Sequence, residues 1–342
     1  MSDRASAVGV FGGARTAKPA TARLGAALAL AGVALAAAIG WGVAGPAAGA
    51  DAAFPGENGK IAVTGTAGSR QALLTMDPDG SNLDVLAAPK SFALHPDWSP
   101  NGQRLVFEFV GPHATSSHRI AVIDESGRGL HLITGGKRFS DSFPTWSPNG
   151  KRIAFFRQRI SPNGQYRKPQ LWVMRANGKR PRQLTKNGMS NQYATWSRSG
   201  LAWVIEDRTD SWVKSIDFTR GRARTTLLSK THDQYEFIDW SPDGTELVYD
   251  LYELGGGSNP GTQNIFRAEV PKGAPDQLTS YDAPEGAYAP AWAPAADKIA
   301  FTEANADGDP SIWTIDPDGS NPDQLTTGPL WRYTPTWQAV RD

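Results

Sequence analysis

Residues that could carry out catalysis are sparse in this chain, and their spacing fits none of the common catalytic motifs. The five histidines stand at positions 95, 113, 118, 131 and 232, and His113 and His118 fall within one segment. There is no cysteine, no Gly-x-Ser-x-Gly elbow, no His-Glu-x-x-His pair and no glycine-rich phosphate loop before a helix. Since these patterns activate nucleophiles or hold catalytic metals, the sequence favours a binding protein without a cofactor over an enzyme.

One segment has oxygen-bearing side chains at alternate positions, as calcium loops do. Asn305, Asp307 and Asp309 supply these oxygens. Pro310 stands where such a loop needs glycine, and a strand is expected from Ser311. A polar hairpin loop is therefore the better interpretation, and the three residues stay weak candidates for metal ligands.

A stronger set of binding residues lies a few positions before a recurring tryptophan. Its members are a histidine, carboxylates and tyrosines, which offer hydrogen-bond donors, acceptors and flat faces to a peptide end or a sugar. The candidate ligand-binding residues are His95, Asp141, Tyr193, Glu236, Tyr288 and Tyr333. Each of them could equally be a structural or solvated residue.

The tryptophans mark a repeat that explains how these residues are brought together. Three nearly identical segments of the form Trp-Ser-Pro-Asn/Asp-Gly start at Trp98, Trp146 and Trp240. Looser copies contain Trp196, Trp292 and Trp337. Successive tryptophans are 44 to 52 residues apart. A short apolar strand follows each of the first five copies, then a variable loop and a second strand, so four short strands per repeat predict one β-propeller blade.

The repeat predicts an all-β fold, a six-bladed β-propeller with four antiparallel strands per blade over residues 51–342. Ser-Pro-Asn/Asp-Gly and Asp-Pro-Asp-Gly suit tight hairpin turns. The first repeat starts without its tryptophan strand, at Asn58–Val63, whereas the last tryptophan strand, Tyr333–Val340, has nothing after it. We expect these ends to pair and close the ring, and the six tryptophans to fill the space between adjacent sheets.

Antiparallel strands place the short turns on one face of a propeller and the longer connections on the other. The longer connections include Val110–Ser117, Arg157–Pro169, Leu251–Asn264 and Glu303–Pro310. Loops on a rigid scaffold commonly carry recognition, so this face is the predicted binding face, although neutral variation of solvated loops would give the same pattern. One of these loops is basic, with Arg157, Arg159, Arg167 and Lys168, and another is acidic, with Glu303, Asp307 and Asp309. The opposite charges either orient a partner or form a solvated rim.

Residues 1–50 resemble an export leader. Basic residues precede an uncharged run rich in Ala, Leu and Val from Leu24, which ends at Ala48-Gly49-Ala50. The segment is either a cleaved signal peptide or a retained signal anchor, and both place the body outside the cytoplasm, as a secreted, periplasmic or envelope protein. Removing four of 35 basic residues and one of 34 acidic residues leaves 31 and 33. This balance argues against a nucleic-acid partner.

The repeat, with its Pro-x-Trp-Ser-Pro-Asp/Asn-Gly start and Gln-Leu-Thr end, resembles that of the TolB-type family of WD40-like propellers. The resemblance covers the chain after the leader, and it implies a six-bladed propeller without the N-terminal α/β domain of TolB, since only residues 51–56 precede the first strand. We expect an exported, monomeric binding or scaffold protein that recognises a protein or peptide of the cell envelope, with a membrane contact only through an uncleaved anchor. The alternatives are a metal-dependent lactonase-like or hydrolase-like enzyme and a glycan-binding module.

Overall fold

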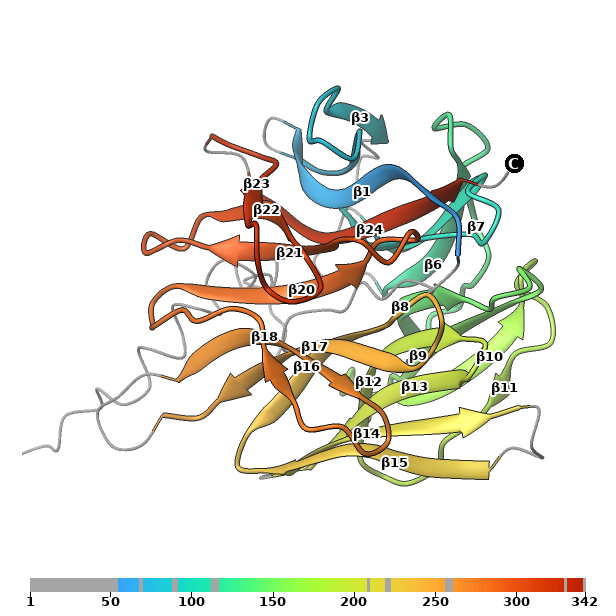
Figure 1. The fold of residues 1–342 in the computed structure, drawn as a ribbon. Helices are drawn as coiled ribbons and strands as arrows, with labels where there is room; N and C mark the ends of the chain where they lie inside the picture. Colours follow the sequence, from blue (N-terminus) through green and yellow to red (C-terminus); the bar gives the residue numbers. More distant parts are fainter. Residues whose placement is uncertain are drawn as a thin grey trace, which may run out of the picture.

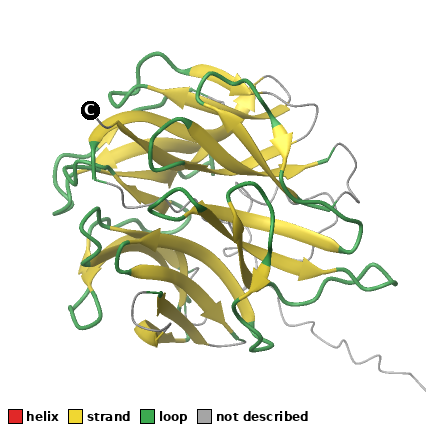
Figure 2. Cartoon of the chain, turned by 90° about the vertical axis from the view of Figure 1, so that its right-hand side faces the viewer, coloured by secondary structure: helices red, strands yellow, loops and turns green. Residues whose placement is uncertain are grey.

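The computed structural model describes residues 55–67, 70–87, 92–111, 117–207, 210–218, 223–255, 261–328 and 331–340. Within these ranges every regular element is a β-strand, as Figure 2 shows. The same ranges contain no helix that is long and apolar enough to cross a membrane. The leader predicted at residues 1–50 lies outside the described residues, so its role stays a prediction.

The described strands form six sheets of four antiparallel strands, which confirms the predicted propeller. The first three blades, each given from its inner strand outward, have the following strands. Blade 1 is β24 (Arg332–Val340), β1 (Glu57–Ala67), β2 (Arg70–Met76) and β3 (Asp84–Ala87). Blade 2 is β4 (Phe92–Trp98), β5 (Arg104–Val110), β6 (Arg119–Asp124) and β7 (His131–Leu132). Blade 3 is β8 (Phe139–Trp146), β9 (Arg152–Arg159), β10 (Gln170–Arg175) and β11 (Arg182–Gln183).

The other three blades repeat this order. Blade 4 is β12 (Ser190–Ser197), β13 (Gly200–Glu206), β14 (Asp210–Asp217) and β15 (Ala223–Thr231). Blade 5 is β16 (Gln234–Trp240), β17 (Glu246–Glu253), β18 (Thr262–Glu269) and β19 (Asp276–Gln277). Blade 6 is β20 (Gly286–Trp292), β21 (Ile299–Ala304), β22 (Pro310–Ile315) and β23 (Asp323–Gln324).

The two ends of the chain meet in blade 1. Strand β24 pairs with β1 from Glu57 opposite Val340 to Gly65 opposite Arg332, and Figure 1 shows the two strands side by side in red and blue. Residues at opposite ends of the sequence therefore complete one sheet. This pairing confirms the predicted closure and removes the exposed edges that an open ring would leave.

The repeated turn sequences form the turns that their residue types predict. The amide of Gly102 donates to the carbonyl of Ser99 at 2.8 Å, and Gly150 bonds Ser147 in the same way at 2.8 Å. Gly80 closes the Asp-Pro-Asp-Gly turn by donating to Asp77 at 2.9 Å. Gly102 and Gly150 have φ of 67° and 64°, a region that favours glycine, although Ala296 adopts a φ of 61° in the corresponding turn of blade 6.

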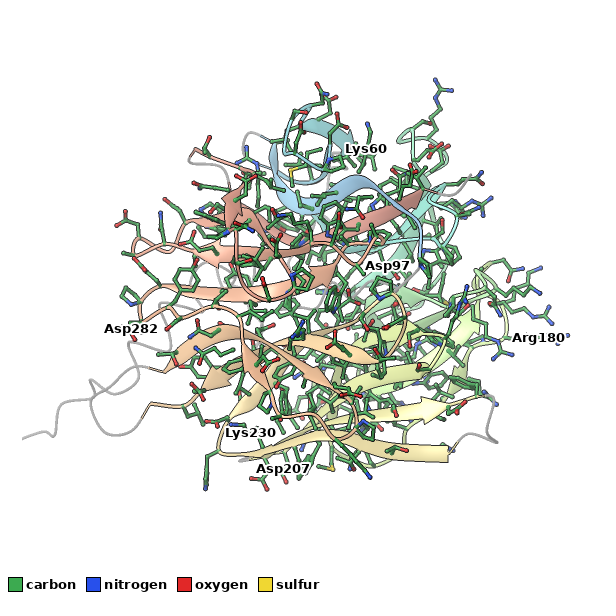
Figure 3. All side chains as sticks on the ribbon, in the orientation of Figure 1. Lys60, Asp97, Arg180, Asp207, Lys230 and Asp282 are labelled. Carbon is green, nitrogen blue, oxygen red and sulfur yellow. The ribbon has the colours of Figure 1, made fainter. Side chains whose placement is uncertain are left out.

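The six repeat tryptophans are buried between neighbouring sheets. Trp146, for example, packs with Val106 and Ile120 of blade 2 and with Ile153 and Phe155 of blade 3. An aspartate before some of these tryptophans ties inner strands together: Asp97, labelled inside the molecule in Figure 3, accepts a hydrogen bond from the Trp146 amide at 2.5 Å. Packing between blades therefore supplies a large part of the core.

The outer edge of the blades differs from the predicted pattern. The sequence predicts a fourth strand that ends in Leu-Thr, but in blades 3, 5 and 6 the outer strand has two residues and ends just before that pair. The threonine hydroxyl instead accepts a hydrogen bond from the third strand, as Thr185 does from the Leu171 amide at 2.9 Å. A side-chain acceptor thus replaces one backbone acceptor at the edge of the sheet.

Candidate ligand-binding face

The connections of the propeller lie on two faces. The Ser-Pro-Asn-Gly and Asp-Pro-Asp-Gly turns share the short-turn face, while the links between blades and between the second and third strands share the other, here named the long-loop face. The link from β9 to β10 is extended by a bridge between Ile160 and Tyr166. The corresponding link in blade 4 runs only from Glu206 to Asp210. Parts of Val110–Ser117 and Leu251–Asn264 lie outside the described residues.

All six predicted ligand-binding residues lie on inner strands, but they do not share one position. His95 and Tyr193 stand three residues before their tryptophan, Asp141 five, and the other three stand four before it. Each inner strand has a register shift there, and His95 and Tyr193 have positive φ values of 52° and 54°. All six side chains are buried, with residue exposures from 0 to 7%. Ligand contact by these residues stays a prediction.

In blades 2 to 5, the residue three positions before the tryptophan has an aromatic ring, and these rings pack against one another from blade to blade. His95 lies 4.6 Å from Phe143 between ring centroids, Phe143 lies 5.6 Å from Tyr193, and Tyr193 stacks on Phe237 at 5.2 Å. Phe143 and Phe237 were missed by the sequence analysis. Their constant separation in sequence, three residues before Trp146 and Trp240, is the signal that could have identified them.

In blade 2, His95 belongs to a buried cluster centred on Glu108. The Glu108 carboxylate contacts His95 Nδ1 at 2.9 Å and also contacts His118 Nδ1. Burial alone would raise the pKa of Glu108, but the two histidines outweigh it and lower that pKa to about 2. Burial lowers the pKa of His95 despite its carboxylate neighbour. The cluster therefore holds a charged carboxylate whose charge is compensated.

In blade 3, Asp141 forms a two-pronged ion pair with Arg157. The Arg157 Nε donates to Asp141 Oδ1 at 2.6 Å, and its Nη2 donates to Oδ2 at 2.8 Å. The guanidinium also lies over Phe139 at 4.7 Å and Trp172 at 5.2 Å from the ring centroids. Arg157, predicted as a loop residue, therefore lies in β9 and fixes two aromatic side chains.

These two aromatic side chains belong to a cleft of about 920 Å³ on blade 3, which we call the basic cleft. Six of its lining residues are cationic and none is acidic: Arg138, Arg157, Arg159, Arg167, Lys168 and Lys186. The sequence analysis identified the four from the β9–β10 segment, but missed Arg138 and Lys186. Both lie in links between blades, which the ring brings next to that segment.

The remaining candidates contact polar neighbours in the interior. The Tyr333 hydroxyl accepts a hydrogen bond from Gln71 Nε2 at 2.8 Å, and Glu236 Oε2 accepts one from Gln263 Nε2 at 2.9 Å. Burial raises the pKa of Glu236 well above its ordinary value, as the nearby Asp250 and Glu206 also do. Glu236 thus differs from Glu108, because no described cation pairs with it.

The segment considered for calcium forms a hairpin link between β21 and β22. Asn305 Oδ1 accepts hydrogen bonds from the amides of Asp307 at 3.0 Å and Asp309 at 2.9 Å. The next strand begins at Pro310, one residue before the predicted start. Among the described residues, no three His, Asp or Glu side chains converge in a way that could hold a metal ion.

Comparison with known proteins defines the fold without defining an activity. No protein-family model and no curated protein matches the chain. The chain is similar to the solved structure of TolB from Acinetobacter baumannii, with 19% identity and a TM-score of 0.67 over 83% of this chain and 68% of that one. It is similar to a putative TolB from Agrobacterium tumefaciens, with 19% identity and a TM-score of 0.59 over 83% of this chain and 99% of that one.

Proteins of other kinds have the same architecture. A hydrazine synthase from Kuenenia stuttgartiensis is 13% identical, with a TM-score of 0.66 over 84% of this chain and 47% of that one. The chain is therefore a six-bladed propeller that is structurally similar to the propeller of TolB at low sequence identity. At such identities a shared fold carries no shared activity.

Proposed function

We propose that this chain is an exported, non-catalytic binding or scaffold propeller that docks an acidic segment of a protein or peptide in the basic cleft. The observation that carries the proposal is the lining of the cleft, where six cations face a cleft of about 920 Å³ with no acidic residue among them. Such a surface attracts carboxylates and repels cationic partners. Export depends on the leader at residues 1–50, as the sequence analysis predicts.

The cleft combines a fixed floor with exposed charges. Asp141 holds Arg157, and Arg157 holds Phe139 and Trp172, so this part of the lining is ordered before a ligand arrives. Arg159, Arg167 and Lys168 are exposed around it, in the lining of the same cleft. A preorganised floor reduces the entropy lost on binding, while exposed charges steer the partner toward the cleft.

A second candidate ligand is an acidic glycan. Tyr166 is 36% exposed and lies in the lining of the cleft with Trp172. Flat aromatic faces suit sugar rings as well as peptide side chains. An acidic peptide is the first choice because guanidinium groups, which bind a carboxylate through two hydrogen bonds, are three of the five lining cations other than Arg157, which is already paired with Asp141.

The experiment is a titration of the purified full-length chain with a fluorescent peptide rich in Asp and Glu, with a lysine-rich peptide as the comparison. The triple change Arg159→Glu, Arg167→Glu and Lys168→Glu should weaken binding about 10-fold to 100-fold, since exposed ion pairs are each worth about 0.2–1 kcal/mol and reversal adds repulsion. The matched control is Lys151→Glu, Arg175→Glu and Lys179→Glu, exposed residues at the short-turn end of the same blade.

Equal binding by the two triple variants would contradict the placement of the site. Binding of oligogalacturonate in place of the peptide, with the same sensitivity to the first triple variant, would select the glycan. A loop replacement should begin at Ile160 rather than Arg157, because removing Arg157 leaves Asp141 without its partner.

A further inference from the structure

Three carboxylates gather near the centre of blades 4 and 5 without a described cation beside them. Glu236 of β16 and Asp250 of β17 both accept hydrogen bonds from Gln263 Nε2, at 2.9 and 2.7 Å. Glu206, at the end of β13, accepts one from Gln192 Nε2 at 2.5 Å. Gln263 therefore uses the same amide nitrogen for two acids. Asp250 Oδ1 also accepts a hydrogen bond from the Ala289 amide at 3.2 Å, whereas no hydrogen bond to Glu236 Oε1 or Glu206 Oε1 occurs among the described residues.

The negative charge of these buried carboxylates has no positively charged partner among the described residues. Glu236 and Asp250 are buried, and no ion pair involving either of them, or Glu206, occurs among the described residues. Burial raises the pKa of Asp250 to about 8 and that of Glu206 to about 7, despite their amide partners. Isolated buried carboxylates are rarely kept without a partner, because each favours protonation or a bound cation.

Tyr193 adds a second, independent sign of a ligand. Its side chain is fully buried, and its hydroxyl has no hydrogen-bond partner. The ring stacks at 5.2 Å on Phe237, the residue that follows Glu236. Burial raises the pKa of Tyr193, and the charges of Glu236, Glu206 and Asp250 raise it further, so the hydroxyl lies within electrostatic range of the same three acids. Buried hydroxyls without a partner are uncommon and call for an explanation.

We propose that Tyr193, Glu206, Glu236 and Asp250 form a binding site for a primary ammonium group, either a lysine side chain or the amino terminus of a peptide. An ammonium group has three N–H donors and no acceptor, which matches a site made of acceptor oxygens. Among the described residues these acids do not converge closely enough to hold a metal ion. An ammonium nitrogen holds its acceptor oxygens at about 2.7–2.9 Å, farther than the ~2.3–2.6 Å of a calcium ligand, so it suits a more widely spaced set of oxygens.

This site goes beyond the proposed function and does not depend on it. Its residues lie on β12, β13, β16 and β17, whereas the basic cleft is lined by β8 to β11 and the links around them. The charge-reversed cleft variant should therefore bind amines normally. Loss of peptide binding in the cleft and loss of amine binding in the centre are distinguishable outcomes.

Ammonium binding should release protons. The titratable groups that face the site are the three carboxylates with Tyr193, Tyr252 and Tyr288, and among the described residues no Lys, Arg or His pairs with them. A bound cation favours the ionised carboxylates, so the apparent affinity for an amine should rise between pH 6 and pH 8.

The test is calorimetric titration of the purified full-length chain with n-butylamine, with n-butanol as the neutral isostere, in two buffers of different ionisation enthalpy. Butylamine should bind and release protons, and butanol should not bind. Tyr193→Phe and Glu236→Gln should each weaken butylamine binding about 10-fold. The matched control is Tyr249→Phe, which removes another buried tyrosine hydroxyl outside the candidate residues and should leave binding unchanged.

Two peptides then separate the two sources of an ammonium group, a trialanine amide with a free amino terminus and an acetylated Ala-Lys-Ala amide. Binding of either one in competition with butylamine supports the proposal. Absence of butylamine binding would overturn it, as would equal effects of Tyr193→Phe and Tyr249→Phe. Calcium binding that Glu236→Gln abolishes, without any amine binding, would also overturn it and indicate a metal site.

Discussion

Blades 2 and 3 bury charged side chains in compensated pairs, whereas blades 4 and 5 bury them without compensation. Glu108 has two histidines, and Asp141 has Arg157. Glu236 and Asp250 occupy comparable depths, yet their hydrogen-bond donors are neutral: the Gln263 side chain for both, and the Ala289 amide for Asp250. The same four-stranded blade thus supports both arrangements, so burial alone does not distinguish a structural charge from one that is available to a ligand.

The largest effect should come from breaking the ion pair of blade 3. Arg157→Ala leaves Asp141 buried with no partner and should reduce the free energy of unfolding by about 3–5 kcal/mol. Urea denaturation measures the loss. Arg159→Ala is the control, because Arg159 is exposed on the same strand and should change stability by less than about 0.5 kcal/mol. Equal losses in both variants would contradict the structural role given to Arg157.

The compensated cluster of blade 2 should make stability fall in acid. The folded pKa of Glu108 is about 2 and its ordinary value is 4.5, so the stabilisation is present above about pH 4.5 and is lost as the pH falls toward 2. Thermal unfolding between pH 2 and 6 should show a weaker pH dependence in Glu108→Gln than in wild type. Glu57→Gln, an exposed change, should behave as wild type.

The uncompensated acids of blade 5 should give the opposite pH dependence of stability, with stability falling as the pH rises. The pKa of Asp250 is raised from 3.8 to about 8, so its ionisation costs stability that increases as the pH rises from about 4 to 8. Asp250→Asn removes this cost and should stabilise the protein at pH 8 while changing its stability little at pH 4. Urea denaturation at the two pH values measures the change. Destabilisation at pH 8 would show that the carboxylate is compensated after all.

The smallest expected effect is a difference in stability between two variants that each remove one buried tyrosine hydroxyl. Tyr193→Phe removes a hydroxyl without a partner and should leave stability unchanged or slightly higher, whereas Tyr333→Phe breaks the bond with Gln71 and should cost about 1 kcal/mol. Thermal unfolding of the two variants side by side gives the comparison. A larger loss for Tyr193→Phe would indicate a structural partner for its hydroxyl.

Much of the fold could be predicted from the sequence because the same blade pattern recurs six times along the chain. The tryptophan spacing predicted the blade number, the proline and glycine turns predicted the hairpins, and Tyr333–Val340 was correctly expected to pair with the first strand. The short outer strands were not predicted, because a threonine hydroxyl can replace a backbone acceptor without changing the sequence pattern.

The candidate site was predicted only in part. The basic residues of the β9–β10 segment are adjacent in the sequence and were recognised, but Arg138 and Lys186 join them only when the ring is formed. The six candidate ligand residues were expected just before the tryptophan strands, but they lie within the inner strands themselves. Their register is mixed, because each inner strand has a shift that turns successive side chains out of strict alternation.

The sequence by itself determined the repeat, the number of blades and the closure, since these follow from local turn chemistry and from patterns that recur along the chain. Only the tertiary structure decided which buried charges have partners. Glu108 meets His118 across neighbouring strands, and Glu236 comes to lie near Tyr193 of the preceding blade without meeting a described cation. Charge compensation depends on distances between side chains of different strands, and the repeated residue pattern does not specify those distances.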